Sequence, residues 1–199
     1  NFTRSYEALY GSEARAASAV HRTFESLRER IDYRPETLVW NIRDRNLYCA
    51  RNARNETLPW DAQIVCSGAT DRLLPVPGWQ FAGTYSLGGS QLVLKSQGCA
   101  IGRRIAFVGS GPLLYLVAAQ YAAAGANIAG VYDTSPWRAR LGALPALLAG
   151  ARNLFKGVGL ELSLRRAGVR VHRGITPLQI EGTADHGVSG FAYRDHAGQ

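Results

Sequence analysis

The stretch that most constrains the fold of this chain runs from residue 104 to residue 133 and reads RIAFVGSGPLLYLVAAQYAAAGANIAGVYD. A short apolar run leads into the turn Gly109-Ser110-Gly111, a long segment rich in alanine follows, and a second apolar run ends on Asp133. This order of strand, glycine turn, helix and second strand is typical of a nucleotide-binding βαβ unit. The stretch therefore predicts an α/β fold, with a Rossmann-like parallel sheet and flanking helices.

Each residue of the turn has a physical role in the predicted site. Gly109 permits the tight turn out of the first strand, and Gly111 has no side chain, so a pyrophosphate can approach the backbone. Pro112 suits the first turn of a helix, whose N–H groups and positive dipole end favour an anion. Asp133 lies 24 residues after Gly109, near the spacing of about 20 at which an acid reaches a ribose hydroxyl. The expected nucleotide contacts are Gly109, Ser110, Gly111, Pro112 and Asp133.

One position departs from the G-x-G-x-x-G pattern of such turns. Leu114 replaces the third glycine, which normally lets the helix pack closely on the strand. We expect a slightly splayed helix or a shifted phosphate, with the small residues Ala118 and Ala119 restoring close contact one turn later. A strand-to-helix turn with no ligand is the alternative interpretation.

The residues also bear on which nucleotide binds. Arg138 and Arg140 follow Asp133 closely, and arginines at this place can meet the 2′-phosphate of NADP. Asp133 would repel that phosphate, which favours NAD or ATP. We prefer the second interpretation, and the choice among the three nucleotides stays open.

Composition limits the class of protein. With 199 residues, 46% of them hydrophobic, the chain can bury a substantial core. It has no apolar run of about 18 residues, so no membrane span is expected. The three cysteines form no C-x-x-C pair, which argues against a disulfide framework or a metal site and favours a reducing, cytoplasmic setting. The net charge of +8 comes without a nucleic-acid reader motif, so a solvated basic surface is preferred to nucleic-acid binding.

Apolar periodicity predicts elements before the nucleotide unit. A helix is expected up to about residue 33, with Ser12 as its cap, and another over residues 90–97 after Gly88-Gly89. Strands are expected over residues 38–42, 47–50, 56–58 and 62–66, with the middle two paired around a loop at 52–55.

The same periodicity predicts elements after the nucleotide unit. A helical stretch should run from Asp133 to about residue 167, with breaks near Pro145 and near Gly157-Val158-Gly159. A third parallel strand is expected over residues 169–172, followed by a small antiparallel β-meander over 175–181 and 188–193.

The segment from Ile64 to Gly78 reads IVCSGATDRLLPVPG. Its proline-glycine part, residues 74–78, should be an extended crossing at a domain boundary, because proline cannot donate a ladder hydrogen bond. The whole segment resembles the Ala-Thr-Gly motif and following Pro-x-Pro-Gly that lead from the FAD domain into the NAD(P) domain of two-dinucleotide flavoproteins. Ser67 stands where threonine is usual and keeps the hydroxyl. The resemblance implies FAD contacts at Ser67, Gly68 and Ala69.

A closer likeness is carried by GATDRLLPVPGW, LGGSQLVLKSQG and GSGPLLYLVAAQYAAAG. These runs resemble the large flavoprotein subunit of bacterial amino-acid and amine dehydrogenases, the group of hydrogen cyanide synthase, opine oxidase, proline and hydroxyproline dehydrogenases, and sarcosine oxidase. The resemblance implies that residues 1–78 are the rear part of an FAD domain that lacks its first strand. Residues 79–199 would be a nested NAD(P)-type domain, truncated near its C-terminal end.

What the likeness implies about function follows from the same family. The chain would be a fragment of an FAD-dependent oxidoreductase subunit that acts on an amino acid or secondary amine and is inactive alone. It would associate with other dehydrogenase subunits and hold NAD(P) or ATP at its second site; no catalytic residue is assigned. The absence of methionine also indicates a fragment or a processed chain.

Two other functions are compatible with the glycine turn. The first is a non-catalytic nucleotide-binding module that stabilises a hetero-oligomeric dehydrogenase. The second is an S-adenosylmethionine-dependent methyltransferase, whose cofactor also uses a glycine turn and an acid, although the proline crossing before Gly78 speaks against it.

Overall fold

The computed structural model describes residues 12–136 and 151–195. They fall into two compact units, the first from Ser12 to Ala69 and the second from Thr70 onward. The boundary expected after residue 78 lies inside the second unit. None of the described helices combines the length and the apolar character needed to cross a lipid bilayer.

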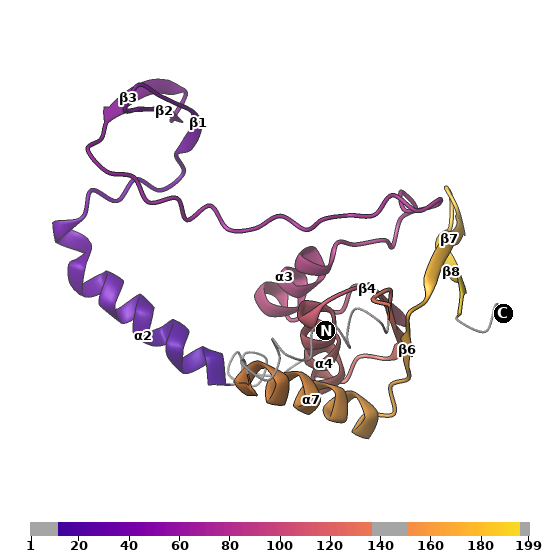
Figure 1. The fold of residues 1–199 in the computed structure, drawn as a ribbon. Coiled ribbons are helices and arrows are strands. Elements are labelled where there is room, and N and C mark those ends of the chain that lie inside the picture. Colours follow the sequence, from indigo (N-terminus) through magenta and orange to yellow (C-terminus); the bar gives the residue numbers. More distant parts are fainter. Residues whose placement is uncertain (1–11, 137–150, 196–199) are drawn as a thin grey trace. The chain divides into compact units, whose positions relative to one another are not determined.

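The first unit contains one long helix and one small sheet. Helix α2 (Ser12–Leu27) ends in the 3₁₀ turn η1 (Arg28–Arg30). Strands β1 (Leu38–Arg43), β2 (Asn46–Arg51) and β3 (Arg54–Pro59) form an antiparallel sheet in the order β1-β2-β3 (Figure 1). The expected helix and the expected pairing of the middle strands are confirmed over these ranges.

Two-residue turns connect the strands of this sheet. Asp44 and Arg45 have φ of 50° and 57°, and Asn52 and Ala53 have φ of 48° and 58°. Positive φ at both central residues gives the turn a twist that matches the twist of a hairpin. The loop expected over four residues is therefore tighter, and β3 begins at Arg54.

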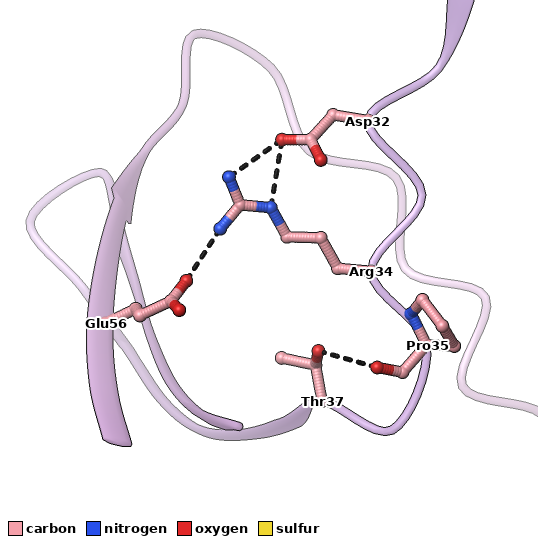
Figure 2. A network of polar contacts seen from close by, with 5 residues as sticks. All are labelled: Asp32, Arg34, Pro35, Thr37 and Glu56. Atoms are coloured by element: carbon pink, nitrogen blue, oxygen red, sulfur yellow. Dashed lines mark hydrogen bonds and ion pairs between the residues drawn. The ribbon is translucent and has the colours of Figure 1, made fainter. Parts of the chain in front are cut away.

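A guanidinium ties the segment before β1 to the sheet (Figure 2). The Nε atom of Arg34 donates to Oδ2 of Asp32 at 2.9 Å, and one terminal nitrogen donates to Oε2 of Glu56 on β3 at 2.7 Å. The hydrogen bond from Arg34 is the main reason that the pKa of the exposed Asp32 carboxyl is lowered. Arg34 thus links the segment that leads into β1 to β3, the edge strand on the opposite side of the sheet.

The strand predicted over residues 62–66 is not formed, and this prediction was wrong. These residues have no helix or strand assignment, and Ile64 and Val65 are 89% and 70% exposed. A strand needs a neighbour for its backbone N–H and C=O groups, and none of the described strands pairs with this run. An apolar run alone was therefore an insufficient signal.

The second unit is built on a parallel sheet. Strands β4 (Ile105–Gly109), β5 (Ile128–Asp133) and β6 (Val171–Arg173) pair in the order β4-β5-β6. Helix α4 (Pro112–Ala124) connects β4 to β5, and helix α7 (Ala151–Arg166) precedes β6 (Figure 1). The predicted Rossmann-like α/β architecture is confirmed, with the third strand starting two residues later than expected.

The core of this unit lies between the sheet and its helices. Leu114, Val117 and Tyr121 of α4 are fully buried, since their exposed fractions are 0%. Burial of each such side chain contributes roughly 1.5–3 kcal/mol. They pack in one cluster with residues from the sheet, from α7 and from helix α3 (Leu87–Gln97), among them Phe107, Val131, Leu164 and Leu94.

Two predictions about helix ends were wrong. Helix α7 runs without a break through Gly157 and Gly159, because neither glycine is held in a positive-φ turn that would end the helix. Helix α3 begins at Leu87 and includes Gly88 and Gly89, because two side chains accept hydrogen bonds from their N–H groups. The break expected near Pro145 lies outside the described residues.

The antiparallel pair predicted near the end of the chain is confirmed as β7 (Thr176–Thr183) and β8 (Gly187–Arg194). The proline-glycine segment runs beside this pair, since Pro77 O accepts from Ile180 N at 2.8 Å. A Cβ at Gly78 would lie 2.0 Å from the oxygen of Ile180, so only glycine permits this approach.

An aromatic cluster joins β8 to one face of the parallel sheet. Tyr132 on β5 stacks on His172 of β6, with ring centroids 4.9 Å apart and planes at 8°. Phe191 and Tyr193 of β8 lie 5.3 Å and 5.0 Å from the Tyr132 ring. The hairpin therefore packs on this face, whereas Phe107 and Val131 belong to the core on the other.

Candidate nucleotide site

The site expected from the sequence lies where β4 passes into α4. Strand β4 ends at Gly109 and helix α4 begins at Pro112, with Gly111 as its N-cap. Gly111 has φ 86° and ψ 177°, a conformation that is essentially restricted to glycine. A Cβ placed there would meet no described atom within 4 Å. The backbone in front of α4 is therefore open to an approaching group, as a phosphate site requires.

Helices α3 and α4 differ in how their N-terminal N–H groups are satisfied. At α3, Oγ of Ser86 accepts from Gly89 N at 3.1 Å, and Oδ2 of Asp71 accepts from Gly88 N at 2.6 Å. At α4, the N-cap residue Gly111 makes no side-chain hydrogen bond. The positive end of the α4 helix dipole lies at this glycine turn, where an anion would be stabilised.

Leu114 fills the place that a third glycine would leave empty. Its exposed fraction is 0%, and its Cδ1 lies 3.9 Å from the position that a Cβ on Gly109 would take. The side chain therefore packs under the turn, while Ala118, also 0% exposed, lies one turn further along in the same core. The leucine is accommodated inside the protein and leaves the outer side of the turn open.

Asp133 lies beside the glycine turn, as the spacing predicted, because it pairs with Gly109 in the register of β4 and β5. Its carboxylate, however, is only 1% exposed. The hydroxyl of Tyr115 donates to Oδ2 at 2.6 Å, and the N–H of Ser135 donates to Oδ1 at 2.7 Å. Each carboxylate oxygen thus already accepts a hydrogen bond from its own chain, and the expected contact with a ribose hydroxyl remains a prediction.

The turn and the end of β5 are also linked through backbone groups. Thr134 N donates to the oxygen of Gly109 at 2.8 Å, and the Thr134 hydroxyl donates to the same oxygen at 3.2 Å. Ile175 N donates to the oxygen of Asp133. These bonds hold the ends of β4 and β5 and the segment after β6 at one edge of the sheet.

An ion pair lies at the same edge of the sheet. Arg173, which pairs with Asp133 in the register of β5 and β6, contacts Oε1 of Glu161 on α7. Arg165 lies 2.8 Å from the same oxygen. The hydrogen bond that Arg173 donates to Glu161 is the main cause that lowers the pKa of Glu161, and the same bond is the main cause that raises the pKa of Arg173.

The residues expected to contact FAD lie at the end of the first unit. Ser67, Gly68 and Ala69 are exposed and belong to no helix or strand. Gly68 has φ 79°, and a Cβ there would meet no described atom within 4 Å. The two arginines weighed for a 2′-phosphate, Arg138 and Arg140, lie outside the described residues.

Three residues with structural roles near the site were not singled out from the sequence. Tyr115 holds Asp133, Arg173 pairs with Glu161, and Asp71 caps α3. The sequence could have indicated Tyr115, because its hydroxyl is the one polar side-chain group in the first two turns of α4. Among the described residues, no three His, Cys, Asp or Glu side chains cluster as metal ligands.

Comparisons of the sequence identify relatives among bacterial oxidoreductase subunits. The chain is 36% identical over 174 residues to an opine oxidase subunit of Rhizobium meliloti. The matched region makes up 85% of this chain and 36% of that protein. It is 29% identical over 172 residues to the hydrogen cyanide synthase subunit HcnB of Pseudomonas aeruginosa, covering 86% of this chain and 37% of that protein. The chain thus spans little more than a third of the length of these relatives. No protein-family model matches it.

Solved structures give the fold. The ferredoxin reductase of the CYP199A2 system from Rhodopseudomonas palustris matches with a TM-score of 0.56 at 18% identity, over 88% of this chain and 40% of that one. An NAD-dependent persulfide reductase from A. fulgidus matches with a TM-score of 0.54 at 16% identity, over 89% and 31%. The chain therefore shares the fold of part of these reductases.

The sequence relationship is more specific. The chain is a homologue of HcnB and of the matched opine oxidase subunit. The resemblance carried by GATDRLLPVPGW and the runs that follow it is confirmed by these relatives.

Proposed function

We propose that this chain is part of an FAD-dependent oxidoreductase subunit that acts on an amino acid or a secondary amine. The observation that carries the proposal is the sequence similarity to the opine oxidase subunit, at 36% identity over 85% of the chain. In such an enzyme the flavin supplies the redox chemistry, and the protein supplies binding and orientation. Both named relatives are oxidoreductase subunits, which favours this function over a methyltransferase.

Residues 12–69 belong to the FAD side in this proposal, and Ser67, Gly68 and Ala69 contact the flavin nucleotide. The open space beside Gly68 supports this assignment, because a backbone without a side chain permits close approach of a ligand. The second unit carries the NAD-type or ATP site, with Gly109, Ser110, Gly111 and Pro112 around the phosphates. The open turn and the N-terminus of α4 support that placement.

The proposed subunit works in a hetero-oligomer with other dehydrogenase subunits, in the cytoplasm. Support comes from the relatives, which are named as subunits of larger enzymes. One variant of the proposal gives the second nucleotide a structural role without hydride transfer, and the departure from the third glycine at Leu114 is the sequence feature that motivates it.

The experiment is anaerobic reduction of the purified enzyme that contains this chain. Amino acids and secondary amines are added one at a time, and the visible absorbance of the flavin is followed. We expect bleaching by at least one of them. An enzyme that holds no flavin, or whose flavin is reduced only by NADH or NADPH and by no amine, would contradict the proposal.

A matched pair of variants tests the FAD contacts. Gly68 and Gly168 have φ of 79° and 73°, and a Cβ at either position would meet no described atom within 4 Å. Both changes therefore place an alanine at a positive φ, where an L side chain is strained. We expect Gly68→Ala to lower the flavin content of the enzyme, and Gly168→Ala to leave it unchanged. Equal loss of flavin in both variants would contradict the assignment of Gly68 as an FAD contact.

A further inference from the structure

The carboxylate of Asp133 is held by its own chain at the place where a nucleotide-binding acid usually reads the ribose. The Tyr115 hydroxyl bond at 2.6 Å is short, as expected for a hydroxyl that donates to a charged oxygen. A carboxylate oxygen can accept more than one hydrogen bond, but the side chain of Asp133 is only 1% exposed. A ribose 2′-hydroxyl could therefore reach it only after the groups that cover it move, which reduces the affinity gained from that hydrogen bond.

We infer that the second nucleotide site recognises a diphosphate and does not read the 2′ position of the ribose through Asp133. Tyr115 is the positioning residue of this arrangement, because its hydroxyl keeps the carboxylate turned into the protein. The ligand class is a nucleotide that carries a diphosphate, with a 2′-hydroxyl or a 2′-phosphate. The inference rests on the proposed second nucleotide site.

The charges beside Asp133 support the same conclusion. Arg173 is the neighbour of Asp133 in the sheet, and its guanidinium is paired with Glu161. Arg165 also contacts Glu161. The two acids and the two arginines at this edge balance one another in formal charge. These four side chains therefore add no net formal charge beside the proposed ribose position.

The location of Tyr115 explains how it acts. It lies in α4, close to the N-terminus that faces the proposed diphosphate, and Asp133 ends the neighbouring strand. The hydrogen bond between them joins the helix to the strand at the edge where the nucleotide is expected. Loss of this hydroxyl removes a donor to Oδ2 of Asp133 and the group that lies against it, so a ligand hydroxyl can donate there in its place.

The test measures dissociation constants for NAD and NADP by calorimetry on the complete subunit. Wild type, Tyr115→Phe, Asp133→Asn and the double variant are compared. We expect Tyr115→Phe to raise the preference for NAD over NADP by about fivefold, roughly the effect of one hydrogen bond. Asp133→Asn alone should change the ratio by less than about twofold, within ordinary context effects. In the double variant the effect of Tyr115→Phe should disappear, because the carboxylate is gone.

The possible results distinguish failure of the inference about Asp133 from failure of the proposed nucleotide site. If wild type prefers NAD and Asp133→Asn removes that preference, Asp133 reads the ribose directly and the inference fails while the site stands. If wild type binds neither nucleotide, nor ATP, both fail. A Tyr115→Phe ratio equal to that of wild type overturns the positioning role. Thermal unfolding of each variant confirms that the binding data come from folded protein.

Discussion

Single side chains decide where the helices of the second unit begin. Asp71 and Ser86 accept hydrogen bonds from the first N–H groups of α3, at 2.6 Å and 3.1 Å. A carboxylate at this end of a helix also interacts favourably with the helix dipole. The N-terminus of α4 has no such cap at Gly111. The two helices therefore differ at their N-cap positions.

The first prediction concerns Asp71. We expect Asp71→Ala to lower the free energy of unfolding by about 1–2 kcal/mol, because α3 loses a charged cap. Urea unfolding followed by circular dichroism measures the change. Asp61→Ala is the control, since Asp61 is exposed, and its effect should stay within about 0.5 kcal/mol. Equal losses in the two variants would show that Asp71 has no special role as a cap.

At the residue scale, the sequence predicted positions better than side-chain orientations. The spacing from Gly109 placed Asp133 at the end of the second strand, and the structure puts it there. It did not reveal that the carboxylate is buried against Tyr115, because that depends on which helix residue faces the strand end in three dimensions. Leu114 was expected to disturb the turn, whereas it packs in the core.

At the scale of elements, hydrogen bonds fix α3 to α4 inside an apolar interface. The Tyr121 hydroxyl donates to the oxygen of Ser90 at 2.8 Å, and Nε2 of Gln91 donates to Oε1 of Gln120 at 2.9 Å. Burial raises the pKa of Tyr121, despite the hydrogen bond to Ser90. The polar contacts therefore set the register in which the two helices pack.

The second prediction removes one of these hydrogen bonds. Tyr121→Phe should lower the free energy of unfolding by about 1–3 kcal/mol, because the buried oxygen of Ser90 loses its donor while the ring remains. Chemical unfolding gives the value. Tyr33→Phe serves as control, since that ring is 51% exposed, and little change is expected from it. A Tyr121→Phe variant as stable as wild type would show that the bond contributes nothing.

The third prediction concerns α7 and β6 and depends on pH. Glu161 has a pKa below its usual 4.5, mainly through the hydrogen bond from Arg173. The unfolded chain therefore binds this proton more readily than the folded one. The pair stabilises the fold fully above the usual pKa, and its contribution is lost as pH falls through the lowered pKa.

Glu161→Gln should remove this dependence. The variant should be less stable than wild type near neutral pH by about 1 kcal/mol or less, since the pair is partly exposed. The difference should vanish in acid, where wild-type Glu161 is protonated. Unfolding curves from neutral to acid pH measure it. A difference that stays constant across this range would mean that the effect of the substitution is not electrostatic.

Strands were predicted correctly where the sequence nearby also contains the strand that pairs with them. The βαβ unit, the small antiparallel sheet and the final hairpin each include the neighbours that they need. The run over residues 62–66 lacks a described neighbour and stays without a strand assignment. Glycines at 157 and 159 were over-weighted as helix breakers, because the cost of glycine inside a helix, about 1 kcal/mol each, is offset by packing elsewhere.

At the scale of the whole molecule, the described residues form two compact units. This chain covers 40% and 31% of the two structural neighbours, which are longer chains. The likeness to the opine oxidase subunit and to HcnB was predictable from the sequence, because two motifs occur in a fixed order, the glycine turn and the proline crossing. The substrate was not, because no described residue has been assigned to the reacting atoms.

Diphosphate binding at the open turn of Gly111 underlies the proposed second site, and calorimetric titration of the purified subunit with NAD is its decisive test. Gly111 and Gly125 stand at opposite ends of α4 with φ of 86° and 88°, and a Cβ at either would meet no described atom within 4 Å. We predict that wild type and Gly125→Ala bind NAD with the same affinity, and that Gly111→Ala binds it at least about tenfold more weakly. Equal binding by all three proteins, with both variants folded, would contradict a diphosphate site at this turn.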